Sequence, residues 1–250
     1  YNNKISSEHL IELKKSTQTF IFEDISKKPV PSILRDFSAP VKIDFNYSFE
    51  QLITLITYDT NKFNQWSALQ QYLIKIFKQI LTKIPAEKEI NSSQDTPPNN
   101  LEDISSSLEK VLKPITDAIN NILLSCEFHD HEKSELAYIA LLLQVPSENA
   151  IAQIIKPINP SEIHNLREDI LKIISKNCLA ALVKAYQSCE IEITSNNKAN
   201  NTSLAPEPNI ISARALKNAC LMLLSYYSED ESQQGALLKL SQSQFDDSNN

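Results

Sequence analysis

The stretch that decides the fold is KPVPSILRDFSAPVKI, residues 28–43, because the sequence pattern differs on its two sides. Pro29 and Pro31 lie two residues apart, so both rings leave an extended segment on the same side and neither nitrogen can donate to a ladder. Such a segment belongs at the edge of a sheet. Beyond Pro40, apolar and polar residues alternate with the period of a half-buried strand. The apolar members of this alternation are Val41, Ile43 and Phe45. The sequence therefore predicts short β structure up to residue 45.

After residue 45 the apolar residues recur three and four apart, which is the spacing of helices with one buried face. Ser48 and Gln51 form a capping box at the first helix, and Pro160 is expected at the first position of the longest one. Pro114 is expected to kink or split the helix in which it lies. The expected helices cover residues 48–58, 63–80, 101–122, 135–143, 147–155, 160–186, 210–227 and 232–241. Such a succession predicts a mainly α fold, an α-solenoid-like stack of antiparallel helices after a short β segment.

The composition excludes several classes of protein. With 250 residues, of which 42% are hydrophobic and 22% charged, the chain can bury a core of ordinary size. Gly235 is the only glycine, so a P-loop, a dinucleotide fingerprint or a nucleophile elbow cannot be built. The net charge of −7 argues against nucleic acid and anionic membranes as partners. Because neither a signal-peptide pattern nor an apolar run of membrane-spanning length is present, we expect a cytoplasmic protein.

The cysteines are widely spaced and include no Cys-x-x-Cys pair. They are Cys126, Cys178, Cys189 and Cys220. Three of them continue the apolar faces of expected helices, so the sequence predicts reduced thiols in the core rather than a metal site or a disulfide framework.

One local cluster could hold a metal ion. It is FHDHE at residues 128–132, in which imidazoles and carboxylates together suit zinc or nickel. The cluster lies between two expected helices, where such a run commonly caps the next helix and faces water, and we favour that interpretation. Two carboxylate pairs on polar helix faces are interpreted as solvated charge. These pairs are Glu168 with Asp169 and Glu190 with Glu192. Phe63 and Trp66 could line a groove, but aromatic residues three apart on an amphipathic helix usually belong to the core.

Several stretches resemble the bacterial aminopeptidase N group, which are zinc-dependent alanyl aminopeptidases of the gluzincin type. The most specific is the stretch 28–43, which resembles the junction between a small β-sandwich domain and the large helical C-terminal domain. DTNKFNQW at 59–66 is similar to the second helix of that helical domain, and RALKNACL at 214–221 is similar to a helix about midway through it. Weaker resemblances cover residues 139–146, 155–168 and 244–250. The segments 86–100 and 195–208 follow no family pattern and fit surface loops of variable length.

The resemblance implies a division of the chain and a role for it. Residues 1–45 would be the last strands of the β-sandwich domain, and residues 46–250 the front part of the helical C-terminal domain. In the family this domain is non-catalytic; it covers the catalytic chamber and limits the access of peptide substrates. The parent protein would be a zinc aminopeptidase, and the missing catalytic domain would be a partner of this chain. The alternative is a free-standing helical-repeat scaffold that holds a protein partner on a concave surface.

The catalytic motif of the family is absent from these residues. A His-Glu-x-x-His helix needs two histidines four apart, and no pair in the chain has that spacing. The histidines are His9, His129, His131 and His164. We therefore expect no zinc in this chain and no activity of the chain alone.

The expected helix 210–227 carries the candidate substrate-chamber residues. Arg214, Lys217 and Asn218 share a narrow polar stripe with Ser225, opposite a broad apolar side. Spacing alone indicates a stripe that faces bulk water. The resemblance places a family arginine where Lys217 stands, on the inner wall of the chamber, positioned to meet the carboxylate end or the backbone of longer peptides. Lysine keeps the charge but lacks the bidentate fork.

Overall fold

The computed structural model describes residues 8–23, 25–82, 101–125, 135–199, 207–227 and 231–246. The chain divides into two compact units, Tyr1–Pro31 and Ser32–Asn250. All eight α-helices of the described residues belong to the second unit. The helical stack of the predicted fold class is therefore confirmed, and the second unit carries it.

The strand expected at residues 41–45 does not form, and the described residues between 8 and 46 contain no strand. Val41, Ile43 and Phe45 are 62%, 39% and 40% exposed. A strand needs a neighbouring strand to pair its amides and carbonyls, and an alternating sequence does not supply that neighbour. Among the described residues before the first α-helix, the regular structure is one short 3-10 turn, Arg35–Phe37.

The first two α-helices, α1 (Phe49–Tyr58) and α2 (Lys62–Leu81), are set by local capping signals and pack on each other. The capping box is confirmed: the Gln51 amide donates to the Ser48 hydroxyl at 3.2 Å, and the Ser48 amide donates to the Gln51 side chain at 2.8 Å. Asn61 caps α2, since its side-chain oxygen accepts from the Asn64 amide at 3.0 Å. Each cap satisfies an amide that the first helical turn would otherwise leave without a partner.

The helix α4 (Leu101–Ser125) continues through Pro114 as one helix. A proline inside a helix lacks the amide proton that a carbonyl of the preceding turn would accept. For Pro114 this is the carbonyl of Lys110; the Tyr72 hydroxyl donates to the neighbouring Val111 carbonyl at 2.7 Å. Burial raises the pKa of Tyr72. The helix is therefore not split at Pro114, which was one of the two predicted outcomes. It stays continuous because α4 packs on α1 and α7, and because Leu112 and Ile115, on either side of the proline, are buried.

Two short helices, α5 (Glu135–Leu142) and α6 (Glu148–Ile154), lie where the sequence predicts them. The Ser147 hydroxyl caps α6 by accepting from the Ala150 amide at 3.2 Å. Between the two helices, the Pro146 carbonyl accepts from Arg167 Nε at 3.1 Å, which ties this connection to the next long helix.

That long helix, α7 (Pro160–Ala199), begins as predicted but extends well past Tyr186. Asn159 precedes it, and the Glu162 amide donates to the Asn159 side chain at 3.4 Å. The expected end at Tyr186 is wrong, because Cys189 and Ile193 continue the buried face at three- and four-residue spacing. The first part of the expected loop 195–208 is therefore helical, while residues 200–206 and the expected loop 86–100 lie outside the described residues.

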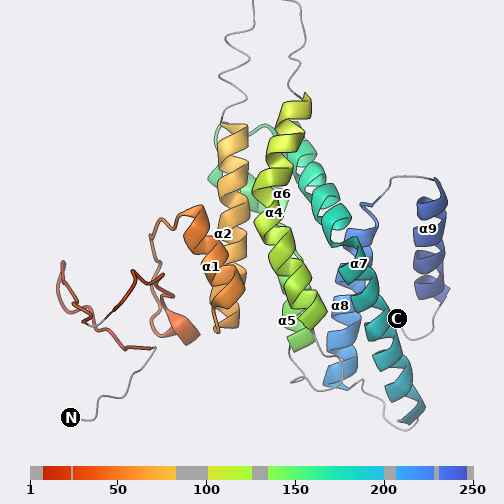
Figure 1. Ribbon diagram of the computed structural model, residues 1–250, viewed down its shortest axis with the longest axis horizontal. Coiled ribbons are helices and arrows are strands. Elements are labelled where there is room, and N and C mark those ends of the chain that lie inside the picture. Colours follow the sequence, from red (N-terminus) through yellow and green to blue (C-terminus); the bar gives the residue numbers. More distant parts are fainter. Residues whose placement is uncertain are drawn as a thin grey trace, which may run out of the picture. The chain divides into compact units, whose positions relative to one another are not determined.

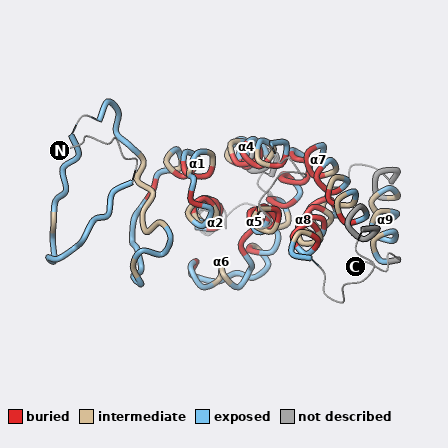
Figure 2. The backbone as a smooth tube through the Cα atoms, turned by 90° about the horizontal axis from the view of Figure 1, so that it is seen from below, coloured by how far each residue is buried: buried red, intermediate tan, exposed pale blue. Residues whose placement is uncertain are grey.

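The chain continues with α8 (Pro208–Leu224) and α9 (Glu231–Asp246). Figure 1 shows α2 and α4 roughly parallel in the view and α7 running obliquely next to α4 and across α8. The contact of α7 with α8 is the most extensive helix–helix contact of the described chain. In Figure 2 the buried faces of α4, α5, α7 and α8 are turned toward one another, which places the core between them. Among the described helices, none is both long enough and apolar enough to cross a bilayer.

The described cysteines lie in this core. Cys178, Cys189 and Cys220 are fully buried and form no disulfide, as the sequence predicts, and Cys126 lies outside the described residues. Burial, and after it the charge of Asp117, raises the pKa of Cys178 from 9.0 to about 12. The Cys178 thiol donates to the Thr116 carbonyl at 3.6 Å.

We expect Cys178 to resist alkylation in the native chain. A pKa raised to about 12 lowers the fraction of reactive thiolate near neutral pH by about a thousandfold, and the core excludes the reagent as well. Iodoacetamide labelling at pH 8, with the labelled residue located by mass spectrometry, should modify Cys178 only after urea is added. Rapid labelling of Cys178 without denaturant would contradict the packing described above.

Candidate functional site

The predicted site residues lie on α8, which packs against both α5 and α7. Residues on several sides of this helix are buried, so little of its surface is left to face solvent as the predicted polar stripe would. The buried residues of α8 are Ile210, Ser212, Ala213, Leu216, Lys217, Cys220, Leu223 and Leu224. One predicted member of the polar stripe, Lys217, is therefore part of the packed interior.

Lys217 is only 5% exposed and is held by two side chains of α7. Its Nζ lies 3.7 Å from Glu190 Oε1 and 5.1 Å from the centre of the Tyr186 ring. Tyr186 and Glu190 are four residues apart, so they lie on the same face of α7. A buried ammonium is unfavourable without a partner, and here a carboxylate and an aromatic face share that task. The Glu190 side chain remains 46% exposed, so the ion pair reaches solvent on its acidic side.

A glutamine of α9 joins the same cluster from the other side. The Tyr186 hydroxyl donates to Gln244 Oε1 at 3.2 Å, and Gln244 Nε2 donates to Asn218 Oδ1. The hydrogen bonds therefore run from α7 through α9 to α8. They fix the exposed Asn218 next to the buried Lys217.

Arg214 lies one turn before Lys217 on α8 and is half-buried. Its Nε is buried and makes no hydrogen bond within the part of the chain that the structure describes. A guanidinium presents donors in a fixed plane that matches a carboxylate. Of the predicted site residues, Asn218 is exposed and Arg214 is half-buried, whereas Lys217 is almost completely buried.

Sequence reasoning missed Tyr186 and placed Glu190 in a solvated pair. The spacing of Tyr186 and Glu190 by four residues was the available signal, since such residues share one helix face. The sequence did not show that this face meets Lys217, because that contact joins residues of two helices. Gln244 belongs to a stretch that resembles the family, but no role followed from it.

The other candidates of the sequence do not form a site in the described residues. The cluster FHDHE at 128–132 lies outside them. Within the described ranges, no three histidine, cysteine, aspartate or glutamate side chains gather in a way that could hold a metal ion. Asp169 is exposed and pairs with Lys172 at 3.7 Å. Phe63 is 44% exposed rather than buried in the core, and its ring lies 5.6 Å from that of Trp66.

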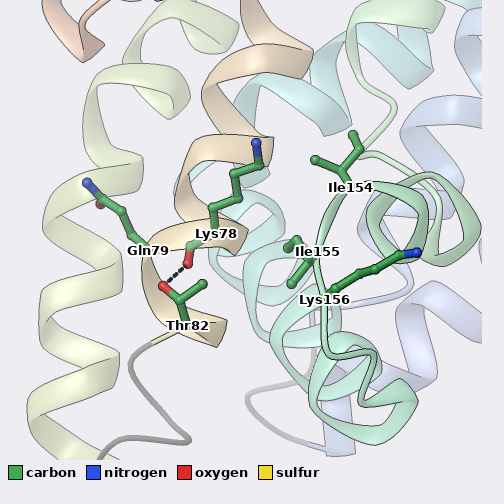
Figure 3. Close-up of a pocket in the computed structure, with 6 residues that line it drawn as sticks. All are labelled: Lys78, Gln79, Thr82, Ile154, Ile155 and Lys156. Carbon is green, nitrogen blue, oxygen red and sulfur yellow. Dashed lines mark hydrogen bonds between the residues drawn. The ribbon is translucent and has the colours of Figure 1, made fainter.

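A surface pocket of about 280 Å³ lies where α2 and α6 end. Lys78, Gln79 and Thr82 come from the end of α2, and Ile154, Ile155 and Lys156 follow from α6 (Figure 3). The Lys78 carbonyl accepts from both the amide and the hydroxyl of Thr82. Helix C-termini carry partial negative charge, so the two lysines complement the helix ends, and the pocket has no further group that points to a ligand.

Comparisons with known proteins identify the family. The model described as "Domain of unknown function (DUF3458_C) ARM repeats" matches residues 49–250, and the model described as "Domain of unknown function (DUF3458) Ig-like fold" matches residues 1–46. Aminopeptidase N of Escherichia coli (strain K12) is 27% identical over 217 residues, which are 87% of this chain and 21% of that protein. Aminopeptidase N of Haemophilus influenzae is 24% identical over 226 residues, 90% of this chain and 22% of that protein.

A third relative and a solved structure agree with these matches. Aminopeptidase N of Caulobacter vibrioides is 25% identical over 86% of this chain and 21% of that protein. The crystal structure of Legionella pneumophila aminopeptidase A in complex with aspartic acid superposes with a TM-score of 0.58 at 16% identity, over 91% of this chain and 23% of that chain, which shows the shared fold. The chain spans about a fifth of the length of the curated relatives it matches. The resemblance to the aminopeptidase N group is confirmed, and the chain belongs to the DUF3458_C family of ARM-repeat domains.

Proposed function

We propose that the chain is the helical, non-catalytic portion of a zinc-dependent aminopeptidase that removes N-terminal residues from peptides. The observation that carries this proposal is the match to three proteins named Aminopeptidase N over 86% to 90% of the chain. In the whole protein this portion covers the catalytic chamber and restricts which peptides enter. A cytoplasmic location fits the described cysteines, which form no disulfide.

In this proposal the cluster on α8 forms part of the chamber wall. Asn218 is exposed and the Arg214 side chain is half-buried, so these two side chains would contact the peptide through their exposed parts. Lys217 would act as a positioning residue. Its ammonium neutralises Glu190 and rests on Tyr186, and thereby keeps the wall free of an uncompensated negative charge. A peptide that ends in a carboxylate would meet a wall whose nearest acidic group is already paired.

The zinc of the proposed enzyme would be held by residues outside this chain. No three candidate ligands gather in the described ranges, and the sequence has no pair of histidines four apart. In this proposal the residues of this chain take no part in the chemical step.

We expect the chain alone neither to hydrolyse aminoacyl substrates nor to hold stoichiometric zinc. A zinc site with catalytic power needs three protein ligands and an open position, and this sequence has no motif that supplies them. Metal analysis after dialysis and an assay with alanyl p-nitroanilide test this expectation. One tightly bound zinc per chain, or turnover by the purified chain, would show that the division of labour proposed here is wrong.

The direct test of the function uses the longer reading frame. We expect the frame that precedes Tyr1 to encode a His-Glu-x-x-His helix, and the longer protein to hydrolyse alanyl p-nitroanilide in a manner that a zinc chelator abolishes. Replacing the glutamate of that motif with glutamine is the matched control, because it removes the general base and leaves the metal ligands in place. A longer protein without peptidase activity would refute the proposal and favour the binding scaffold.

A further inference from the structure

The backbone of the segment that leads into α1 is strained. Leu34, Asp36 and Phe37 have φ angles of 55°, 54° and 55°, and none of them is glycine. This left-handed region is unfavourable for residues with a Cβ, and such residues persist only where their surroundings hold them. The turn Arg35–Phe37 contains no buried residue, so burial of its own side chains does not explain the conformation.

A set of polar contacts with the α1–α2 connection holds this turn. Arg35 donates to Asp59 at 2.7 Å and to Thr60 at 2.7 Å. The Asn61 side chain donates to Asp36 at 2.8 Å. About one helical turn after Asn61, the Asn64 side chain donates to the Ser32 hydroxyl at 2.8 Å and to the Ile33 carbonyl at 3.0 Å. These contacts form a clamp that ties residues 32–36, directly before Phe37, to the start of α2 and the connection that precedes it.

The held turn presents an aromatic ring to solvent. Phe37 is 71% exposed, and its ring centre lies 4.6 Å from that of Phe63, which is itself 44% exposed. Phe63 in turn lies 5.6 Å from Trp66. We call Phe37, Phe63 and Trp66 the aromatic row. The left-handed backbone of Leu34, Asp36 and Phe37 and the exposed apolar area of Phe37 are both unfavourable. Within the unit Ser32–Asn250, the contact with the half-exposed Phe63 covers only part of the Phe37 ring.

The chemistry beside the row indicates an apolar partner. The charged side chains next to the row in the sequence are Arg35, Asp36 and Lys62, and each has a partner. Arg35 pairs with Asp59 at 2.7 Å, Asp36 accepts from the Asn61 side chain at 2.8 Å, and Lys62 pairs with Glu135 at 2.9 Å. Neighbouring rings of the row are tilted by 48° and 39° to each other, and the charges beside the row are paired. Such an apolar surface suits aliphatic or aromatic side chains of a partner.

The size of the row decides between a second copy and a tethered partner. A stable interface between separate proteins buries about 800 Å² on each partner. The aromatic row consists of three side chains, one of them half-buried, and its area is too small for such an interface. A segment of the same polypeptide is present at high effective concentration, so a small contact suffices. The relatives are about five times as long as this chain, so most of such a polypeptide lies outside it.

We propose that the aromatic row is a docking surface for an apolar segment of the longer polypeptide, outside this chain, and that the clamp on residues 32–36 holds the row ready for it. This inference rests on the proposed function, since it requires a longer protein. It goes beyond that function because it assigns an internal docking site that involves neither the chamber nor the α8 cluster.

Hydroxyl-radical footprinting tests the docking surface, with oxidation measured by mass spectrometry in the 250-residue chain and in the longer protein. We expect oxidation of Phe37 and Phe63 to be at least about fivefold slower in the longer protein, because a docked segment excludes water from the row. Leu124 of α4, which is 51% exposed, is the control and should react alike in both. Equal rates at Phe37 in the two proteins would overturn the proposal, and so would equal protection of Leu124, which indicates general shielding.

Two further arms separate the remaining explanations. Protection of Phe37 that rises with the concentration of the 250-residue chain alone would show a second copy on the row and would overturn the proposal. In the longer protein, Phe37→Ala should restore the fast oxidation of Phe63, whereas Leu124→Ala should not. Peptidase activity of the longer protein is measured in the same samples: an active protein with an unprotected row refutes the docking surface alone, and an inactive protein with a protected row refutes the peptidase function alone.

Discussion

Replacing Asp59 with alanine is expected to lower the free energy of unfolding by about 3 kcal/mol, the low end of the range for breaking a buried ion pair. The Asp59 side chain has no exposed surface and lies 2.7 Å from the Arg35 guanidinium. The same carboxylate oxygen accepts from the Asn61 amide at 2.9 Å, and Asp59 also ends α1. The low end of the range applies because the Arg35 side chain is 23% exposed and regains some water when the carboxylate is lost.

The measurement is urea unfolding followed by far-ultraviolet circular dichroism, with Trp66 fluorescence as a local probe of the aromatic row. Asp117→Ala is the matched control. Its carboxylate pairs with Lys113 at 3.1 Å, but both side chains are more than half exposed, so a loss below about 0.5 kcal/mol is expected. Asp59→Asn, which keeps the shape of the side chain, should fall between the two. If Asp59→Ala lost no more stability than Asp117→Ala, the clamp would not hold the turn before α1.

The helix map was largely readable from the sequence because its signals are local. The capping box at Ser48 and the proline after Asn159 each lie within one turn of the start of their helix, α1 and α7. The end of α7 was not readable in this way. After Tyr186 the sequence becomes rich in polar residues, and only packing on Cys189 and Ile193 carries the helix onward.

The strand expected at 41–45 failed for a related reason. The alternation of Val41, Ile43 and Phe45 is a property of one segment, whereas a strand is a property of two paired segments. Residues 1–46 match a model with an Ig-like fold, and the described part of them forms no ladder. The alternation therefore indicated a segment that could form a strand, but it did not indicate a second segment with which that strand would pair.

For the candidate site, too, the sequence pattern of one helix did not show how the helix packs against others. The spacing along α8 placed Lys217 on a polar stripe, and the stripe was expected to face water. In the structure α5 and α7 cover α8 from two sides, so a residue on its polar stripe is buried as well. The partners of Lys217 are 27 and 31 positions away in the sequence, counted as 217 − 190 and 217 − 186, and no periodicity connects them.

In the longer protein, Lys217→Ala is expected to lower kcat/KM for peptides of four or more residues by about tenfold, which corresponds to about 1.4 kcal/mol. The change removes the ammonium that lies 3.7 Å from Glu190, whose side chain is 46% exposed. If the α8 cluster forms the proposed chamber wall, an unpaired carboxylate there would repel the carboxylate end of a peptide, and the lost ring contact would free Tyr186. A single-residue chromogenic substrate has no carboxylate end and would not reach the proposed wall, so its kcat/KM should not change.

Three companion variants separate charge from packing in this experiment. Lys217→Met keeps most of the side-chain volume and removes the charge, so it should behave like Lys217→Ala if the charge is what matters. Lys217→Arg keeps the charge and adds a bidentate fork toward Glu190, so it should retain at least the activity of the unmodified protein on long peptides. Lys184→Ala removes an exposed lysine of α7 and should leave both substrate classes unaffected. An equal loss for long and single-residue substrates, or a Lys217→Met variant with unchanged kinetics, would show that Lys217 serves the packing of α8 and has no part in the chamber.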